Sequence, residues 1–282
     1  MKIEDITVLI TSFRSKEKIY SCLQSIGTKV KIIIVENSND IELKEKVESL
    51  YPNLQCILSP KNLGYAKGNN LGLSKIKTKF ALIINPDAYL DKDALKNFVI
   101  SAKKIENFCI IAPYVQEKKD EDKLKKYKSN KILEVDSVKG FAMFLKMDEF
   151  QDTGFFDENF FIYFEEIDLC KRLRKKNKKI FLDPNIKIFH AGGSSHDKEI
   201  NNQMELSRNW HWMWSSFYFY RKHYNYFYAF FKMIGKFVSA IFKIMLFTLM
   251  FNKNKRNIYY QRFSGILNSM MLRKAWYRPK IF

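Results

Sequence analysis

Short apolar runs alternate with helical patterns through the first 112 residues, and this alternation limits the possible folds more than any other feature. The apolar runs cover residues 6–13, 30–35, 54–58, 80–84 and 109–112. Helical patterns lie between them at residues 16–26, 41–50, 66–76 and 91–104, the last opened by Asp91 as a capping residue. Continuous apolar runs are typical of strands covered on both faces. The sequence therefore predicts an α/β fold, a mostly parallel sheet flanked by helices.

Polar residues follow several of these predicted strands. They occupy residues 11–14, 36–39 and 85–87. In parallel sheets ligands bind beyond the carboxyl ends of the strands, so these segments are expected on one rim. We interpret this rim as a nucleotide site.

Residues 154–174 combine acids with aromatic side chains. Five carboxylates fall within the twelve positions 157–168. Apolar residues recur at helical spacing from Phe164 onward, and Arg172 follows Asp168 by four residues, which predicts a helix with Glu165 and Glu166 in its first turn. A helix dipole alone favours acids there. Buried acids are otherwise costly unless they are paired or used, which makes the segment a candidate for chemistry.

The composition changes near residue 207. The chain has a formal net charge of +19, and residues 207–282 hold fourteen lysines and arginines, no Asp or Glu, and all four tryptophans. This shift predicts two parts, 1–206 and a basic, aromatic-rich helical region at 207–282. The four scattered cysteines do not suggest a disulfide framework or a metal cluster, and the acidic start does not suggest a signal peptide.

Residues 226–251 are apolar but are interrupted by three lysines. Lys232, Lys236 and Lys243 would lie within about 40° of one another on a helix, close to the line of Arg221. The opposite side holds Phe227, Phe230, Phe231, Ile234, Val238, Ile241 and Met245. This pattern predicts an interfacial helix on anionic lipid, with Trp210, Trp212 and Trp214 at headgroup depth. The alternative is a face that docks on the rest of the chain or on a second subunit.

Six motifs in register carry a family resemblance. They are Thr11-Ser12-Phe13, Val35-Glu36-Asn37-Ser38, Asn62-Leu63-Gly64-Tyr65-Ala66-Lys67-Gly68-Asn69-Asn70-Leu71-Gly72, Asn85-Pro86-Asp87, Gly154-Phe155-Phe156-Asp157-Glu158 and Glu165-Glu166-Ile167-Asp168-Leu169-Cys170-Lys171-Arg172. From about Ile6 to Ser195 the chain resembles a family 2 glycosyltransferase of the rhamnosyltransferase-like branch. The resemblance implies a GT-A fold and transfer of a sugar, with inversion, from a nucleoside diphosphate donor to a hydroxyl.

The resemblance also implies a set of donor contacts. They are Thr11, Phe13, Glu36, Asn37, Asn62, Gly64, Asn69, Asn85, Asp87 and Gly140. A divalent ion, Mg²⁺ or Mn²⁺, is expected at Asp87 and His190, although Asn85 stands where the family more widely has a first acid. The glycines and serines of residues 191–195 are expected to bring backbone N–H groups close to phosphate.

The catalytic base implied by the resemblance is Glu166, the second acid of the Glu165-Glu166 pair. Glu165 or Asp168 would orient it or bind the acceptor. A base is needed because the acceptor hydroxyl must lose its proton as it attacks.

Three functions fit these observations. The first is a peripheral glycosyltransferase on the cytoplasmic face of a bacterial inner membrane, moving rhamnose from a dTDP donor to a lipid-linked saccharide. The second is a catalytically silent sugar-nucleotide sensor. The third is a single-strand nucleic-acid-binding protein, suggested by basic charge interleaved with aromatics, but it leaves the acid cluster unexplained, so we expect no nucleic-acid partner. The residues favour no particular oligomeric state.

Overall fold

The structure is a computed structural model that describes residues 2–105, 107–116, 131–190 and 196–279. The chain divides into two compact units, each taken separately below. The first holds Met1–Phe156 and Glu166–Asp197, and the second holds Asp157–Glu165 and Lys198–Phe282. The phosphate contacts expected at residues 191–195 lie outside the described residues, as does most of residues 116–131, whose charge-rich sequence predicts a surface loop.

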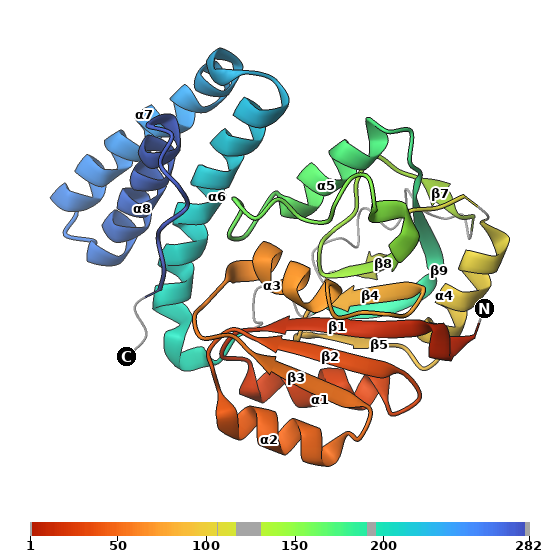
Figure 1. The fold of residues 1–282 in the computed structure, drawn as a ribbon. Coiled ribbons are helices and arrows are strands. Elements are labelled where there is room, and N and C mark those ends of the chain that lie inside the picture. The colour runs from red at the N-terminus through yellow and green to blue at the C-terminus, as the bar shows by residue number, and fades with distance from the viewer. Residues whose placement is uncertain (1, 106, 117–130, 191–195, 280–282) are drawn as a thin grey trace. The chain divides into compact units, whose positions relative to one another are not determined.

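The first unit is built on one sheet, in which nine strands pair among the described residues (Figure 1). Their order is β3-β2-β1-β4-β8-β6-β9-β5, and β7 pairs with β9. The strands are β1 Ile6–Ser12, β2 Lys31–Glu36, β3 Leu54–Leu58, β4 Phe80–Ile84, β5 Ala88–Leu90, β6 Ile110–Gln116, β7 Leu133–Glu134, β8 Ala142–Lys146 and β9 Ile180–His190. Strands β3, β2, β1 and β4 are parallel, which confirms the parallel sheet expected for the first part of the chain. Beyond β4 the sheet is mixed, because β8 is antiparallel to β4 and β6, and β5 is antiparallel to β9.

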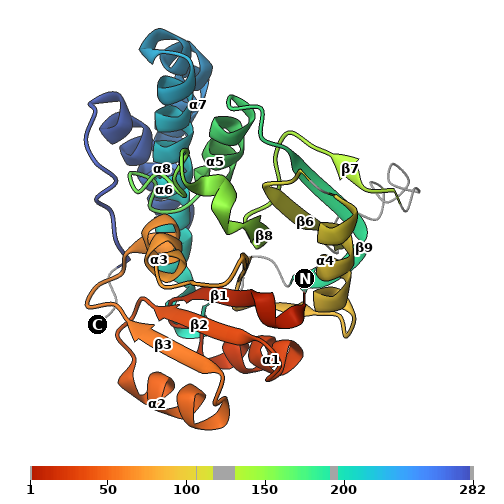
Figure 2. The ribbon, with the colours of Figure 1, turned by 45° about the vertical axis from the view of Figure 1, so that its right-hand side comes forward.

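Helices cover both faces of this sheet (Figure 2). They are α1 Lys16–Ile26, α2 Ile41–Leu50, α3 Gly64–Leu73, α4 Ala94–Lys104 and α5 Glu165–Arg174. The expected bounds of α1 and α2 are confirmed. The expected start of the helix at residues 91–104 is wrong: α4 begins at Ala94 with Asp93 at its N-cap, and β5 precedes it. Asp91 instead lies in the turn between β5 and α4, where its carboxylate accepts a hydrogen bond from the backbone N–H of Asp93 at 3.3 Å.

Helix α3 lies unusually close to β1. A Cβ at Gly72 would collide with the side chain of Leu9, and one at Gly68 would lie 2.6 Å from Thr11 Cγ2. Only glycine leaves room for this approach. The consequence is that α3 and the carboxyl end of β1 form one packed block.

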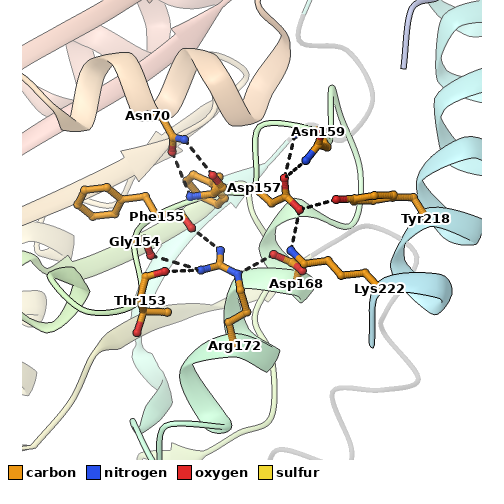
Figure 3. A network of polar contacts seen from close by, with 11 residues as sticks. Asn70, Thr153, Gly154, Phe155, Asp157, Asn159, Asp168, Arg172, Tyr218 and Lys222 are labelled. Atoms are coloured by element: carbon orange, nitrogen blue, oxygen red, sulfur yellow. Dashed lines mark hydrogen bonds and ion pairs between the residues drawn. The ribbon is translucent and has the colours of Figure 1, made fainter. Parts of the chain in front are cut away.

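The second unit is helical, with helices α6 Asn201–His223, α7 Tyr226–Leu249 and α8 Lys253–Met270, and a 3₁₀ turn at Lys198–Ile200 precedes α6. Its small core contains Met213, Phe217, Ala229, Met233 and Ile266. Residues 157–165 belong to this unit. Asp157 Oδ2 accepts hydrogen bonds from Tyr218 Oη at 2.9 Å and from Lys222 Nζ at 2.7 Å (Figure 3). Of the helices that the structure describes, none is long and apolar enough to cross a membrane.

Two expectations about the helical region are corrected by burial. Trp210 and Trp214 are buried, and their indole N–H groups donate to Ser264 Oγ and to the carbonyl of Arg273, so neither stands at a surface. Trp212 is half exposed. Phe230, expected on the outer face of the helix, packs against the core of the unit instead. Helix α6 also begins before the change in composition at residue 207.

Candidate active site

Glu166 lies at the second position of α5, as the sequence predicts, and its side chain runs along Gly140. A Cβ added at Gly140 would lie 3.5 Å from both Cβ and Cγ of Glu166. Burial raises the pKa of Glu166, and the nearby backbone N–H groups of Glu166 and Ile167 oppose that rise without cancelling it. Its Oε2 atom is buried and has no hydrogen-bond partner among the described residues. Glu166 is therefore a carboxylate made more basic by its surroundings.

Asp168, the proposed helper, serves the scaffold in this structure. It is fully buried, and its Oδ2 accepts a hydrogen bond from Arg172 Nε at 2.8 Å. Figure 3 shows Arg172 extending from Asp168 to the chain before residue 157. There it donates to the carbonyl of Thr153 at 2.9 Å and to that of Phe155. The pair thus fixes the segment that leads into the acidic stretch. Glu165, the first residue of α5, is also buried.

Asp87 and His190 come together because β5 and β9 pair. Ala88 stands opposite His190 in the register, and His190 Nε2 lies 3.4 Å from Asp87 Oδ1. Both carboxylate oxygens of Asp87 and both ring nitrogens of His190 are buried without a hydrogen bond to any described residue. Buried polar atoms are rarely left in this state in proteins. Four such atoms on two neighbouring side chains indicate a place prepared for a ligand.

Residues 140–141 connect this pair to Glu166. Gly140 lies against Glu166, while the ring of the next residue, Phe141, stacks on His190 with centroids 4.5 Å apart. The carbonyl of Phe141 accepts a hydrogen bond from the N–H of Asn85 at 2.9 Å. Two consecutive residues therefore hold the candidate base on one side and the Asp87–His190 pair on the other.

The residues expected around the nucleotide are joined to one another. Thr11 Oγ1 donates to Asn69 Oδ1 at 3.0 Å, and Asn37 Nδ2 donates to the carbonyl of Gly64 at 3.2 Å. Asn62 Oδ1 accepts from the N–H of Gly64 at 3.0 Å. The first two bonds join α3 to Thr11 in β1 and to Asn37, the residue after β2, and the third stabilises the turn that enters α3. The contacts of these residues with a nucleotide-sugar donor stay predictions.

Glu36 and Phe13 flank this group. Glu36 is fully buried and accepts hydrogen bonds from the N–H groups of Ser38 and Asp40, at 2.8 and 3.0 Å, and from Ser38 Oγ. Its carboxylate thus stabilises the turn between β2 and α2. Phe13 is partly exposed at the end of β1.

Two side chains at the site were not singled out from the sequence. Tyr65 Oη donates a hydrogen bond to the carbonyl of Gly140, and Phe141 packs on His190 as described. Both belong to segments that the sequence highlighted for their glycines and asparagines. The aromatic residues beside those glycines were the signal that could have identified them.

The residues at Asp87 and His190 suit a divalent ion. A buried carboxylate lacking hydrogen bonds suits Mn²⁺ or Mg²⁺, whereas the imidazole, a ligand of transition metals, favours Mn²⁺ over Mg²⁺. Within the described residues no group of three or more His, Cys, Asp or Glu side chains could hold a metal ion. An ion here would need further oxygen ligands, and a diphosphate can supply them.

The comparison with protein families decides the affiliation. The model of the family described as "Glycosyl transferase family 2" matches residues 7–245. The chain belongs to this family. The resemblance in the six motifs is thereby confirmed, and so is the glycosyltransferase class of the chain.

Two characterised relatives give a finer comparison. The low-salt glycan biosynthesis hexosyltransferase Agl10 of Haloferax volcanii is 26% identical over 200 residues, 63% of this chain. This match spans only 64% of Agl10. The rhamnosyltransferase WbbL of Escherichia coli is 22% identical over 240 residues, 73% of this chain and 88% of WbbL.

Solved structures confirm the GT-A-like fold and the helical C-terminal region. The mannosyltransferase PcManGT from Pyrobaculum calidifontis, in complex with GDP-Man and Mn²⁺, has a TM-score of 0.61 at 12% identity, covering 96% of this chain and 88% of PcManGT. S. aureus TarS 1-349 in complex with UDP has a TM-score of 0.56 at 12% identity, and the match covers 98% of this chain and 94% of the TarS chain.

Proposed function

We propose that this chain is an inverting glycosyltransferase that moves a sugar from a nucleoside diphosphate to a hydroxyl of a lipid-linked saccharide, in cell-surface polysaccharide synthesis. The observation that carries the proposal is the placement of Glu166 and the Asp87–His190 pair on either side of residues 140–141. Inverting transfer needs these two elements close together, since the base and the leaving group act on the same anomeric carbon.

The donor diphosphate would lie at Asp87 and His190. Both side chains present buried, unpartnered polar atoms there. A bound Mg²⁺ or Mn²⁺ would supply positive charge for the leaving diphosphate. PcManGT, a protein of similar fold, was solved with GDP-Man and Mn²⁺, which supports this assignment.

Glu166 would act on the acceptor. Its carboxylate takes the proton from the acceptor hydroxyl, whose oxygen forms a bond to the anomeric carbon from the face opposite the diphosphate. The bond from that carbon to the phosphate oxygen breaks, and the nucleoside diphosphate leaves with the electron pair. A raised pKa suits this role, because a more basic carboxylate accepts the proton more readily near neutral pH.

Rhamnose from dTDP-rhamnose is the proposed donor sugar, supported by the similarity to WbbL. A lipid-linked acceptor is supported by the basic, aromatic helical unit, which carries no Asp or Glu after Glu205. We place the protein on the cytoplasmic face of a bacterial inner membrane, held at the surface and not spanning it.

A panel of nucleotide sugars tests this function. Purified protein is incubated with each sugar, with Mn²⁺ or Mg²⁺ or with chelator, and with lipid extract as the source of acceptor. We expect release of nucleoside diphosphate with dTDP-rhamnose, dependent on both metal and extract. Saturable donor binding without any release would instead identify a silent sensor, and the absence of donor binding across the panel would contradict the proposal.

A further inference from the structure

The helical unit contains an open pocket of about 360 Å³ among α6, α7 and α8, remote in sequence from the residues of the candidate active site. Three cationic side chains line it: Lys236 and Lys243 from α7, and Arg262 from α8. No described residue that lines it carries a carboxylate. The family comparison assigns no role to this pocket.

Two of the three cations, Lys243 and Arg262, lie against one tyrosine, Tyr259. Lys243 Nζ lies 4.8 Å from the centroid of the Tyr259 ring and 3.3 Å from its hydroxyl oxygen. Arg262 Cζ lies 5.2 Å from the same centroid, and Arg262 Nε donates to Asn209 Oδ1 at 2.7 Å. These neutral partners orient the charges without neutralising them. Like charges held close together repel, and a bound anion would relieve that repulsion.

The wall of the pocket on α7 is open at Gly235. A Cβ added there would meet no atom within 4 Å, so packing does not require the glycine. Glycine inside a helix lowers stability relative to alanine. Gly235 is better explained by the space it leaves for a ligand beside Lys236 and Ser239 than by packing.

An apolar face adjoins the pocket along α7. Its exposed side chains are Phe227, Phe231, Val238, Phe242, Met245 and Leu249. Phe231 is 72% exposed and Leu249 78% exposed. At about 100° per residue, Gly235 and Ser239 fall between this face and the two lysines. An anion in the pocket would therefore lie at the margin of an apolar surface, which is where a lipid carries its phosphate.

We propose that this pocket binds the phosphate group of a lipid while the apolar face of α7 enters the boundary of its acyl chains. Phosphate matches the pocket because lysine and arginine side chains donate charged hydrogen bonds to its oxygens. A soluble phosphate has the same chemistry but gives no role to the apolar face. The inference takes from the proposed function only the membrane surface, not the transfer of sugar.

Vesicle binding by the full-length protein tests the inference in the absence of any sugar donor. Two kinds of phosphatidylcholine vesicle are compared at equal surface charge. In one the anionic lipid is phosphatidic acid, a phosphate, and in the other it is cholesteryl hemisuccinate, a carboxylate. Wild type is compared with Lys236→Gln/Lys243→Gln and with the control Lys232→Gln/Lys253→Gln. The control removes the same number of lysines, both exposed and outside the pocket: Lys232 from α7 and Lys253 from α8.

Wild type and the control should bind the phosphate vesicles about tenfold more tightly than the carboxylate vesicles, and the pocket variant should lose this preference. Gly235→Leu, which fills the pocket and changes no charge, should lose it as well, with an unchanged circular dichroism spectrum. Equal behaviour of the pocket variant and the control would overturn the inference.

Other results would point to other occupants. If inorganic phosphate saturates the pocket and the protein does not bind vesicles, the ligand is a soluble phosphate. That result would contradict the lipid assignment. Self-association that Phe231→Ser abolishes, without vesicle binding, would show that a second copy covers the face, and it too would contradict the assignment. None of these outcomes bears on donor turnover, so the inference and the proposed function fail separately.

Discussion

His190 Nε2 lies 3.4 Å from Asp87 Oδ1, although 102 residues separate these two in the chain. The contact depends on a three-residue strand, β5, which pairs with the end of β9 and places Ala88 opposite His190. A carboxylate and an imidazole, buried together without other hydrogen bonds, form the part of the site that faces the leaving group in our account.

Asp87→Ala should weaken binding of the nucleoside diphosphate by about tenfold or more and leave binding of the nucleoside almost unchanged. The reason is that Asp87 would act on the diphosphate and its ion, not on the base. Calorimetry with Mn²⁺ present measures both affinities, and Asp91→Ala, in the turn after β5, is the control. An unchanged diphosphate affinity would make Asp87 a turn residue only.

Gly140→Val should lower kcat by about 100-fold with a nearly constant affinity for donor. Glu166 Cβ and Cγ lie 3.5 Å from where a Cβ at Gly140 would be, so alanine fits and the branched side chain displaces Glu166. A displacement of about 1 Å is enough for a loss of this size. Gly140→Ala is therefore the matched control and should retain most of the activity. Full activity of the valine variant would show that the position of Glu166 against Gly140 has no role in turnover.

Arg172→Met should destabilise the first unit by about 3 kcal/mol, because it leaves the buried carboxylate of Asp168 without its cationic partner. Arg174→Met removes an arginine from the same helix whose partner Asp136 is exposed, and should cost less than about 1 kcal/mol. Urea unfolding of the two variants measures the difference. Similar midpoints would contradict a structural role for the Arg172–Asp168 pair.

The parallel half of the fold could be predicted because its evidence is local. β1, β2 and β4 are short runs buried on both faces, and each is followed by a turn and a helix or another short strand. The mixed half could not be predicted, since β5 has only three residues and β8 pairs with strands distant in the sequence. The periodicity of apolar residues along the sequence does not indicate which distant strands pair.

The site divides in the same way. Glu166 at the start of α5 follows from helical spacing in its own segment. The approach of Asp87 to His190, of Tyr65 to Gly140 and of Phe141 to His190 depends on pairings that the sequence does not reveal. Burial likewise separates Trp210 and Trp214, which lie in the helical core, from Trp212, although all three belong to one aromatic stretch.

The pH dependence of turnover should reflect the raised pKa of Glu166. The base must be ionised, so activity falls as pH drops through its pKa, and burial moves that value above the ordinary value of about 4.3. The acid limb of the kcat profile should therefore lie above about pH 4.3. A limb at or below that pH would contradict the influence of burial on the base.

The most direct test of the account is the turnover of Glu166→Gln, which removes the proton acceptor and keeps the shape of the side chain. Nucleoside diphosphate release is measured with donor, metal and acceptor present, alongside the donor Kd, with Glu42→Gln on the exposed surface as the control. We predict a fall in kcat of about 100-fold to 10,000-fold with a donor Kd within about twofold of wild type. A kcat within about threefold of wild type, far short of the loss expected for a general base, would remove Glu166 from its proposed role and contradict the central claim.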